Sequence, residues 1–197
     1  MSSAATPKGM RRRSLLIEAA GELLLDGGFD AVRHRAVADR ARLPLASTTY
    51  YFGSLEDLMA EAAACVWQRD CAAIAVRGDA VARRRRGRLA TAEALAEVFV
   101  GSDTPIDGLS ARYEMLVLSA RYPRLKDVVA DRDAQLSAIH ADVLAKSGRL
   151  ADAVGVVHLI AMEDGAVVDA LGSADATPVE ATRDALYGVI DALAPRK

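Results

Sequence analysis

Apolar residues recur at helical spacing in most windows of the chain. In the first window, five of them follow the i, i+3, i+4, i+7, i+8 pattern, which places them on one face of a helix: Leu16, Ala19, Ala20, Leu23 and Leu24. Gly27-Gly28 is expected to end this helix, because glycine adopts the left-handed capping conformation at little cost.

The later windows predict further helices, separated by breaks that contain glycine or proline. Runs of β-branched residues, which favour strands, are scarce. The basic stretch Arg77–Arg88 is expected to be a helix end or a solvated connector. The chain is therefore expected to be all-α, with about nine helices. After the first, they are expected over residues 34–41, 45–51, 55–76, 89–100, 109–121, 125–146, 150–171 and 179–193.

The second and third expected helices are joined by the short segment Arg42–Pro44, which makes them a candidate helix-turn-helix. The third helix carries small and hydroxylated side chains, which allow close approach to base edges in the major groove. Its two tyrosines can reach phosphate oxygens, and basic residues begin the second helix. Spacing alone leaves a purely structural three-helix bundle as the alternative. The residues concerned are Ala46, Ser47, Thr48, Thr49, Tyr50 and Tyr51 in the third helix, and Arg33, His34 and Arg35 at the start of the second.

The net charge of −2 over 197 residues conceals an uneven distribution. Basic residues outnumber acidic ones among the first 55 residues, whereas acidic residues outnumber basic ones in the remainder. A basic head on an acidic body suggests a nucleic-acid surface in the head.

Other classes of protein find little support in the sequence. The longest strongly apolar run, Ala153–Met162, is too short to span a bilayer, so no membrane partner is expected. Cys65 and Cys71 would point in different directions on one helix, which indicates a reduced, cytoplasmic protein. No nucleophile elbow, P-loop, dinucleotide fingerprint or zinc spacing occurs, so we expect no catalytic residues, no metal and no cofactor.

Residues 12–58 resemble the DNA-binding domain of the TetR family of transcriptional regulators. The resemblance is carried by apolar and small residues of the first two helices, by Gly28-Phe29, and by a third helix read as Leu43-Pro44-Leu45-Ala46-Ser47-Thr48-Thr49-Tyr50-Tyr51-Phe52. This string, preceded by Val32-Arg33-His34-Arg35-Ala36-Val37-Ala38, is similar to an actinobacterial-type subset of the family. The resemblance implies a flexible tail over residues 1–9, a helix-turn-helix domain over 10–58, and a helical ligand-binding and dimerisation domain over 59–197.

The sequence departs from the family pattern at four positions. Arg42 replaces a frequent glycine in the turn, and Arg33 replaces the usual threonine cap of the second helix. Leu55 replaces a frequent lysine that contacts phosphate, and Thr49 replaces a common tyrosine. These departures put individual phosphate contacts in doubt.

The family position of Arg35 implies a base contact, since an arginine there can pair with guanine O6 and N7. We expect Arg11–Arg13, Arg33 and Tyr51 to hold phosphates. The full predicted DNA-contacting set is Arg33, His34, Arg35, Leu45, Ala46, Ser47, Thr48, Thr49, Tyr50 and Tyr51.

The last two helices are strongly apolar and rich in small residues, so they are candidates for a four-helix interface between two copies of the chain, with an ordinary intrachain core as the alternative. The predicted interface residues are Val154, Val157, Ala161, Val168, Leu186, Val189, Ile190 and Leu193. The larger side chains that could line an effector pocket are Trp67, Phe99, Tyr113, Met115, His158 and Met162, although a plain core role is the alternative for each.

The sequence thus predicts a homodimeric regulator, most often a repressor in this family, that binds a double-stranded operator and is released by a small-molecule effector. The alternative is a helical small-molecule-binding or protein-interaction module that no longer reads DNA, which the residues at 42 and 55 would favour.

Overall fold

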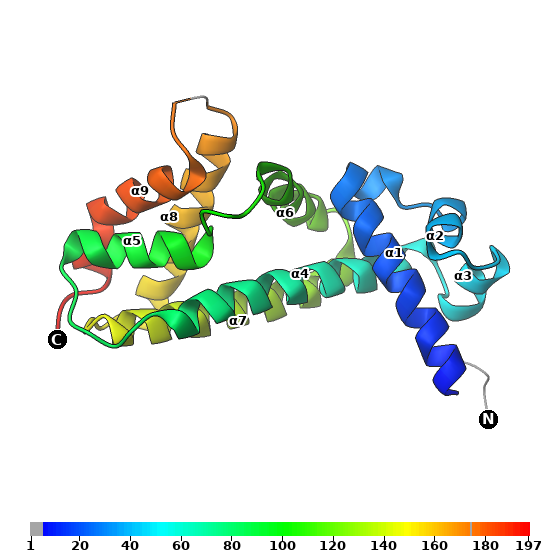
Figure 1. The fold of residues 1–197 in the computed structure, drawn as a ribbon, viewed down its shortest axis with the longest axis horizontal. Coiled ribbons are helices and arrows are strands. Elements are labelled where there is room, and N and C mark those ends of the chain that lie inside the picture. The colour runs from blue at the N-terminus through cyan, green and yellow to red at the C-terminus, as the bar shows by residue number, and fades with distance from the viewer. Residues whose placement is uncertain (1–5, 174) are drawn as a thin grey trace. The chain divides into compact units, whose positions relative to one another are not determined.

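The computed structural model describes residues 6–173 and 175–197, and over these ranges it contains nine α-helices and no strand (Figure 1). The predicted all-α class is confirmed, and most helix boundaries fall within a few residues of those predicted. No helix in the described ranges is long and apolar enough to cross a membrane. The helices are α1 (Pro7–Ala31), α2 (His34–Ala41), α3 (Ala46–Tyr51), α4 (Leu55–Ala80), α5 (Arg88–Phe99), α6 (Ile106–Ser119), α7 (Lys126–Lys146, after a 3-10 turn Pro123–Leu125), α8 (Ala153–Leu171) and α9 (Pro178–Leu193).

The chain forms two compact units that are not continuous in sequence. Unit 1 contains the residues up to Arg69 together with Ser110–Asp131, and unit 2 contains Asp70–Leu109 together with Arg132–Lys197. Helices α4 and α7 therefore each contribute residues to both units. The expected boundary at residue 58 divides the chain differently, because it leaves α6 out of the unit that contains α1 to α3.

The beginning of α1 differs from the expected flexible tail over residues 1–9. The helix begins at Pro7, and the hydroxyl of Thr6 accepts a hydrogen bond from the Gly9 amide at 3.1 Å. Proline suits the first helical position because its missing N–H would be unpaired there anyway. The remainder of the expected tail, residues 1–5, lies outside the described residues.

The core of unit 1 is built from the apolar faces that the spacing predicts. Leu16, Ala20 and Leu24 of α1 are buried in one cluster with Val37 of α2 and Leu58 of α4. The predicted break at Gly27-Gly28 is present as a kink inside α1, because both glycines have non-helical backbone angles and Gly28 has a φ of 64°. This cluster determines which faces of α2 and α3 remain outside.

The turn between α2 and α3 contains a strained residue. Arg42 adopts the left-handed conformation, with φ 54° and ψ 42°, and the amide of Leu43 donates to the carbonyl of Ala38 at 2.9 Å. These bonds satisfy the last carbonyls of α2, as a glycine-containing cap does. The chain thus keeps the tight turn although the residue there is arginine.

Replacing Arg42 with glycine is expected to increase the free energy of unfolding by about 1 kcal/mol, because the left-handed conformation is costly for a residue with a Cβ atom. Arg42→Ala is the matched control, since it removes the charge but keeps the Cβ, and it should not raise stability. Urea unfolding of both variants separates the backbone contribution from the charge. A glycine variant no more stable than the alanine variant would contradict this expectation.

In unit 2, α8 packs against α9, and α9 packs against α5. A Cβ atom on Gly155 would lie 2.5 Å from the carbonyl oxygen of Leu193, so glycine permits this close approach of α8 to the end of α9. Arg149 is also buried in unit 2. Its guanidinium donates to the carbonyl of Ala194 at 2.8 Å and to Asp191 at 2.7 Å, which secures the segment after α9.

For Arg77–Arg88 we expected a helix end or a solvated connector: the first holds for residues 77–80, and the second needs correction. Helix α4 continues to Ala80, and the Nε of Arg77 donates to the carbonyl of Val98 at 2.9 Å. Arg86 is buried, and its amide donates to the carbonyl of Ser147 at 3.0 Å. Part of this basic segment is therefore packed within unit 2.

Candidate functional site

The outer face of α3 carries exposed side chains above a buried anchor. Tyr50 is 55% exposed, and Ala46 and Thr49 are exposed as well. Leu45, just before the helix, is 51% exposed. Thr48 does not belong to this face: it is fully buried, and its hydroxyl donates to the carbonyl of Leu45 at 2.8 Å. The expected contact between Thr48 and DNA is therefore corrected to a structural role.

Two further residues of the predicted recognition set lie between core and surface. Ser47 and Tyr51 are half-buried, and Tyr51 packs against the unit 1 core. The ring of Tyr50 meets that of Tyr51 edge-on, with 4.9 Å between centroids. Because Tyr51 is anchored, this contact orients the exposed Tyr50 ring.

The basic residues at the start of α2 differ in how free they are. The guanidinium of Arg33 donates to the carbonyls of Phe29 and Val32, and it pairs with Asp30 at 3.3 Å. It provides no side-chain cap for α2, as the loss of threonine at this position led us to expect. Arg33 therefore satisfies the carbonyls that end the preceding helix.

His34 and Arg35 follow at the beginning of α2. His34 is half-buried, and its Nδ1 atom is buried without a hydrogen-bond partner in the described part of the chain. Arg35 is exposed and has no ionic or hydrogen-bonded partner among the described residues. Arg35 is thus available to an external acceptor.

The arginines at the start of α1 are similarly divided. Arg13 pairs with Glu61 of α4, and its guanidinium lies over the Phe52 ring, 5.1 Å from the centroid. Arg11 and Arg12 are exposed and unpaired within the described ranges. Arg13 thus joins α1 to Phe52, the residue that follows α3, whereas Arg11 and Arg12 precede it on α1.

The junction between α3 and α4 is capped by Ser54. The hydroxyl of Ser54 accepts from the amide of Asp57 at 3.0 Å. The Asp57 carboxylate pairs with Arg124 at 2.9 Å. Leu55, which stands where the family often has lysine, is half-buried and packs against the unit 1 core.

The predicted effector-pocket residues are divided between the two units. In unit 1, Trp67, Tyr113 and Met115 are buried. In unit 2, Phe99 is buried, whereas His158 and Met162 are exposed on α8. The burial of the first four agrees with the core role that we kept as the alternative, and the exposure of His158 and Met162 on α8 excludes an interior position in the single chain.

Sequence inspection missed a buried polar pair in unit 2. His140 of α7 and Glu163 of α8 are both fully buried, with 2.6 Å between Nε2 and Oε2. The other ring nitrogen of His140, Nδ1, donates to the carbonyl of Leu136 at 2.7 Å. The ring also meets Phe99 edge-on. Because the two residues lie on different helices, no local spacing in the sequence could have paired them.

Burial and mutual attraction shift the pKa of both members of the pair. Burial raises the pKa of the Glu163 carboxyl against the opposing attraction of His140. Burial alone would lower the pKa of His140, but the charge and hydrogen bond of Glu163 outweigh it and raise the pKa. With Nδ1 bonded to Leu136, Nε2 is the ring nitrogen that meets Glu163.

These shifts predict a loss of stability in alkaline solution. A group whose pKa is raised in the folded state stabilises the fold below its unfolded pKa, here 6.5 for histidine, and loses that contribution as the pH rises. Above this value the free energy of unfolding should decline by up to about 1.4 kcal/mol per pH unit. Urea unfolding of the wild type and of the apolar double variant His140→Leu/Glu163→Leu tests this expectation. Parallel pH curves for the two proteins would contradict it.

The predicted interface residues fall into two groups. On α8, Val154, Val157 and Val168 are 61%, 56% and 52% exposed, and Ala161 is exposed between them. On α9, Val189 and Leu193 are half-buried, whereas Leu186 and Ile190 are fully buried inside unit 2. Leu186 and Ile190 are therefore core residues, because α9 turns that face toward the interior of the unit.

The exposed residues of α8 define an apolar stripe, which we take as Val154, Val157, Ala161 and Val168. A Cβ atom added to Gly165 of α8 or Gly188 of α9 would have no heavy atom within 4 Å, so both helices have open surface nearby. An exposed stripe of this kind is unusual on a monomer and typical of a protein–protein interface.

Comparisons with known proteins agree with this geometry. The family model described as bacterial regulatory proteins, tetR family, matches residues 16–62, and that of the tetracyclin repressor-like C-terminal domain matches residues 86–192. No curated protein matches the chain.

Several solved structures resemble the whole chain. The multidrug binding protein EbrR, solved with imidazole, is 27% identical, with a TM-score of 0.71 over 90% of this chain and 94% of that one. A member of the TetR family from Streptomyces coelicolor A3 is 26% identical, with a TM-score of 0.67 over 90% of this chain and 97% of that one. A transcriptional regulator from Rhodococcus sp. Rha1 shares the fold at 20% identity, with a TM-score of 0.71 over 94% of this chain and 98% of that one.

Proposed function

This chain belongs to the TetR family of bacterial regulatory proteins, and from this premise we propose that it is a homodimeric repressor that binds a palindromic operator and is released by a small organic effector. The observation that carries the proposal is the exposed face of α3, with Arg35 unpaired beside it in the described structure. Side chains that are exposed and uncommitted can contact bases and phosphates without first breaking internal bonds.

The proposed DNA-contacting set is smaller than the sequence alone suggested. Leu45, Ala46, Thr49 and Tyr50 form the face that enters the major groove, and Arg35 contacts a base edge. The cations that remain free, Arg11, Arg12 and Arg42, are proposed to bind phosphates. The exposed Arg33 and the buried Thr48 are instead committed to main-chain carbonyls of the motif.

The apolar stripe of α8 supports the dimer in this proposal. Two helix-turn-helix motifs related by a two-fold axis meet successive major-groove faces about 34 Å apart, which a single motif cannot do. Such a dimer requires a palindromic operator, because protein symmetry and site symmetry then correspond.

Release by an effector requires a molecule with different affinities for two conformations of the protein. Helix α4 supports this part of the proposal, because one continuous helix begins directly after the recognition motif and extends into unit 2. The structures of EbrR with ethidium and with proflavin, at 27% identity, favour a small organic effector.

The proposal is tested by footprinting on the DNA adjoining the gene, followed by affinity measurements over a range of salt concentrations. A palindromic footprint is expected, with log affinity falling linearly as log salt concentration rises. A protein without any sequence-specific footprint that still binds small molecules would instead be the helical binding module considered above. The left-handed Arg42 favours the DNA-binding function, because the turn that the motif needs is kept.

Arg35→Ala is expected to cost about 1–3 kcal/mol on the preferred operator and to relax discrimination at one base pair of each half-site. Arg12→Ala is the matched control, because it removes an exposed cation that is proposed to contact phosphate alone. It should weaken binding to all sequences alike and reduce the salt slope by about 1. Equal weakening by Arg35→Ala on operator and unrelated DNA would contradict a base contact.

A further inference from the structure

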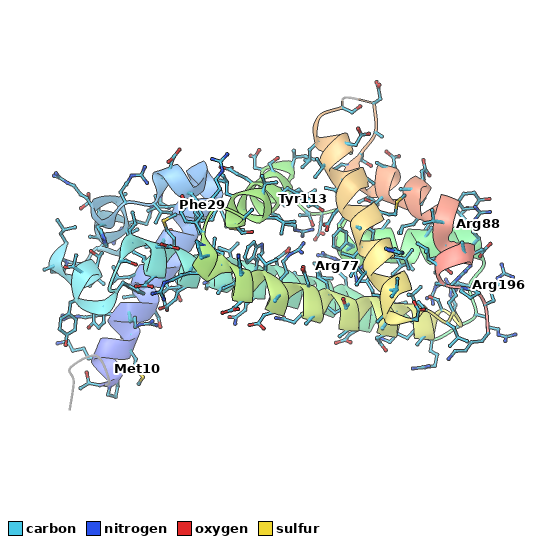
Figure 2. The ribbon with its side chains drawn as sticks, turned by 180° about the vertical axis from the view of Figure 1, so that it is seen from behind. Met10, Phe29, Arg77, Arg88, Tyr113 and Arg196 are labelled. Carbon is cyan, nitrogen blue, oxygen red and sulfur yellow. The ribbon has the colours of Figure 1, made fainter. Side chains whose placement is uncertain are left out.

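A cationic cavity lies in unit 2, where the segment between α4 and α5 meets the end of α7 and the residues after α9. Its volume is about 220 Å³, and it is lined by four cationic side chains, Arg85, Arg86, Arg196 and Lys197, together with glycines and Ser147. No acidic side chain lines it. Figure 2 shows Arg88 and Arg196 at this end of the unit.

Arg86 is the unusual member of this set, because it is a buried cation without an anion. It is 9% exposed, and its Nη1 donates to the Ser147 hydroxyl at 3.3 Å and to the carbonyl of Arg84 at 3.5 Å. Burial and the neighbouring Arg84 lower the pKa of Arg86. The buried Arg132 and Arg149 of the same unit pair with Asp133 and Asp191, whereas no carboxylate of the described residues pairs with Arg86.

Burying an uncompensated guanidinium is costly, so an external anion at this position would be stabilising. Arg85 donates to the main-chain oxygen of Lys197 at 3.0 Å, which holds it at the edge of the cavity. Arg88 does not take part, because it is committed to the main chain and the ring of Tyr187. No side-chain carboxylate of the described residues pairs with the cations of this cavity.

The N-terminus of α5 adds to the positive electrostatic potential in the cavity. Gly87 lines the cavity and is the N-cap of this 12-residue helix, and no side chain accepts from the amides of the first turn. Unpaired amides at a helix N-terminus attract anions, and arginine matches the oxygens of a phosphoryl group in a bidentate manner.

We propose that this cavity binds a phosphoryl-bearing small molecule, with Arg86 at its centre and Arg85, Arg196 and Lys197 around the oxygens. The site belongs to unit 2, whereas α3 belongs to unit 1, so it is a binding site additional to the DNA-contacting face. Its volume accommodates a diphosphate, which carries enough negative charge to match several cations.

The test is calorimetric titration of inorganic pyrophosphate into the full chain at constant ionic strength. The wild type should bind saturably. The variant Arg196→Gln/Lys197→Gln removes two exposed cavity cations and should weaken binding at least about ten-fold. Arg83→Gln is the control, because this exposed arginine belongs to the same run but does not line the cavity. The control should stay within about two-fold of the wild type, since screened surface charges contribute little.

Arg86→Gln keeps a hydrogen-bonding side chain but removes the charge, and it should abolish the rise in melting temperature that pyrophosphate gives the wild type. If this variant does not fold, the weakening of pyrophosphate binding by Arg196→Gln/Lys197→Gln still tests the proposal. Tighter binding of ADP than of pyrophosphate would identify a phosphate ester as the ligand, and the reverse a free polyphosphate. Absence of saturable binding, or equal weakening in the Arg83→Gln control, would overturn the proposal.

Discussion

Replacing Glu163 with alanine is expected to lower the free energy of unfolding by about 3 kcal/mol, one of the two largest effects that we expect from a single substitution in this chain. The carboxylate is fully buried between α7 and α8 and is bonded to the equally buried His140. Its removal leaves Nε2 of His140 without a partner in the core and creates a cavity beside His140.

The expected loss is measured by urea unfolding at pH 6, with protein concentration held constant because dimerisation shifts apparent stability. Asp169→Ala is the matched control: it deletes an exposed acid from the same helix and should change stability by no more than about 0.5 kcal/mol. A double-mutant cycle with His140→Ala completes the test. Residues in direct contact should show a coupling of about 1–3 kcal/mol, so strictly additive losses would contradict an energetically linked pair.

Replacing Val157 with aspartate is expected to raise the dissociation constant of the dimer at least about 100-fold, equivalent to about 2.8 kcal/mol. Val157 lies in the middle of the α8 stripe and is 56% exposed in the single chain. In a two-fold symmetric interface the substitution occurs on both subunits, so it buries two carboxylates without partners and places like charges close together. Operator affinity should fall with the dimer, because one helix-turn-helix motif contacts only one half-site.

Sedimentation velocity at micromolar concentration provides the measurement. The wild type should sediment as a dimer and Val157→Asp as a monomer. Val76→Asp is the matched control, because it introduces the same charge at a 69% exposed valine of α4, away from the stripe. A wild type that is monomeric at this concentration would refute the dimer, and dissociation of the Val76 variant would show that the effect is not specific to α8.

Much of the fold follows from short-range patterns in the sequence. The apolar spacing around Leu16 and Leu24 and the Gly27-Gly28 break predicted helix positions, because helices are stabilised and ended by neighbours within a turn or two. The break at Arg42–Pro44 could be predicted for the same reason. The conformational strain at Arg42 was also foreseeable, since the family pattern places glycine there.

The exposure of individual side chains was harder to predict. The sequence groups Thr48 with Thr49 as hydroxyl residues expected to face the groove. In the structure Thr48 is buried in the core, where its hydroxyl donates to the carbonyl of Leu45. Leu186 and Ile190 read as interface residues, but packing of α9 within unit 2 buries them. On a helix, two positions three or four residues apart share a face, and only the neighbouring helices decide whether that face is inside.

By itself, the sequence determined the helical class, the positions of the helices and the motif with its basic surroundings, because each depends on residues close together in the chain. Only the tertiary structure decided which cations are free, that His140 and Glu163 meet in the interior, and that Arg86 is buried among other cations without a side-chain carboxylate partner in the described residues. These features join residues on separate helices, up to 112 positions apart for Arg85 and Lys197. The charge and burial of such groups depend on what the fold brings beside them, which no local pattern records.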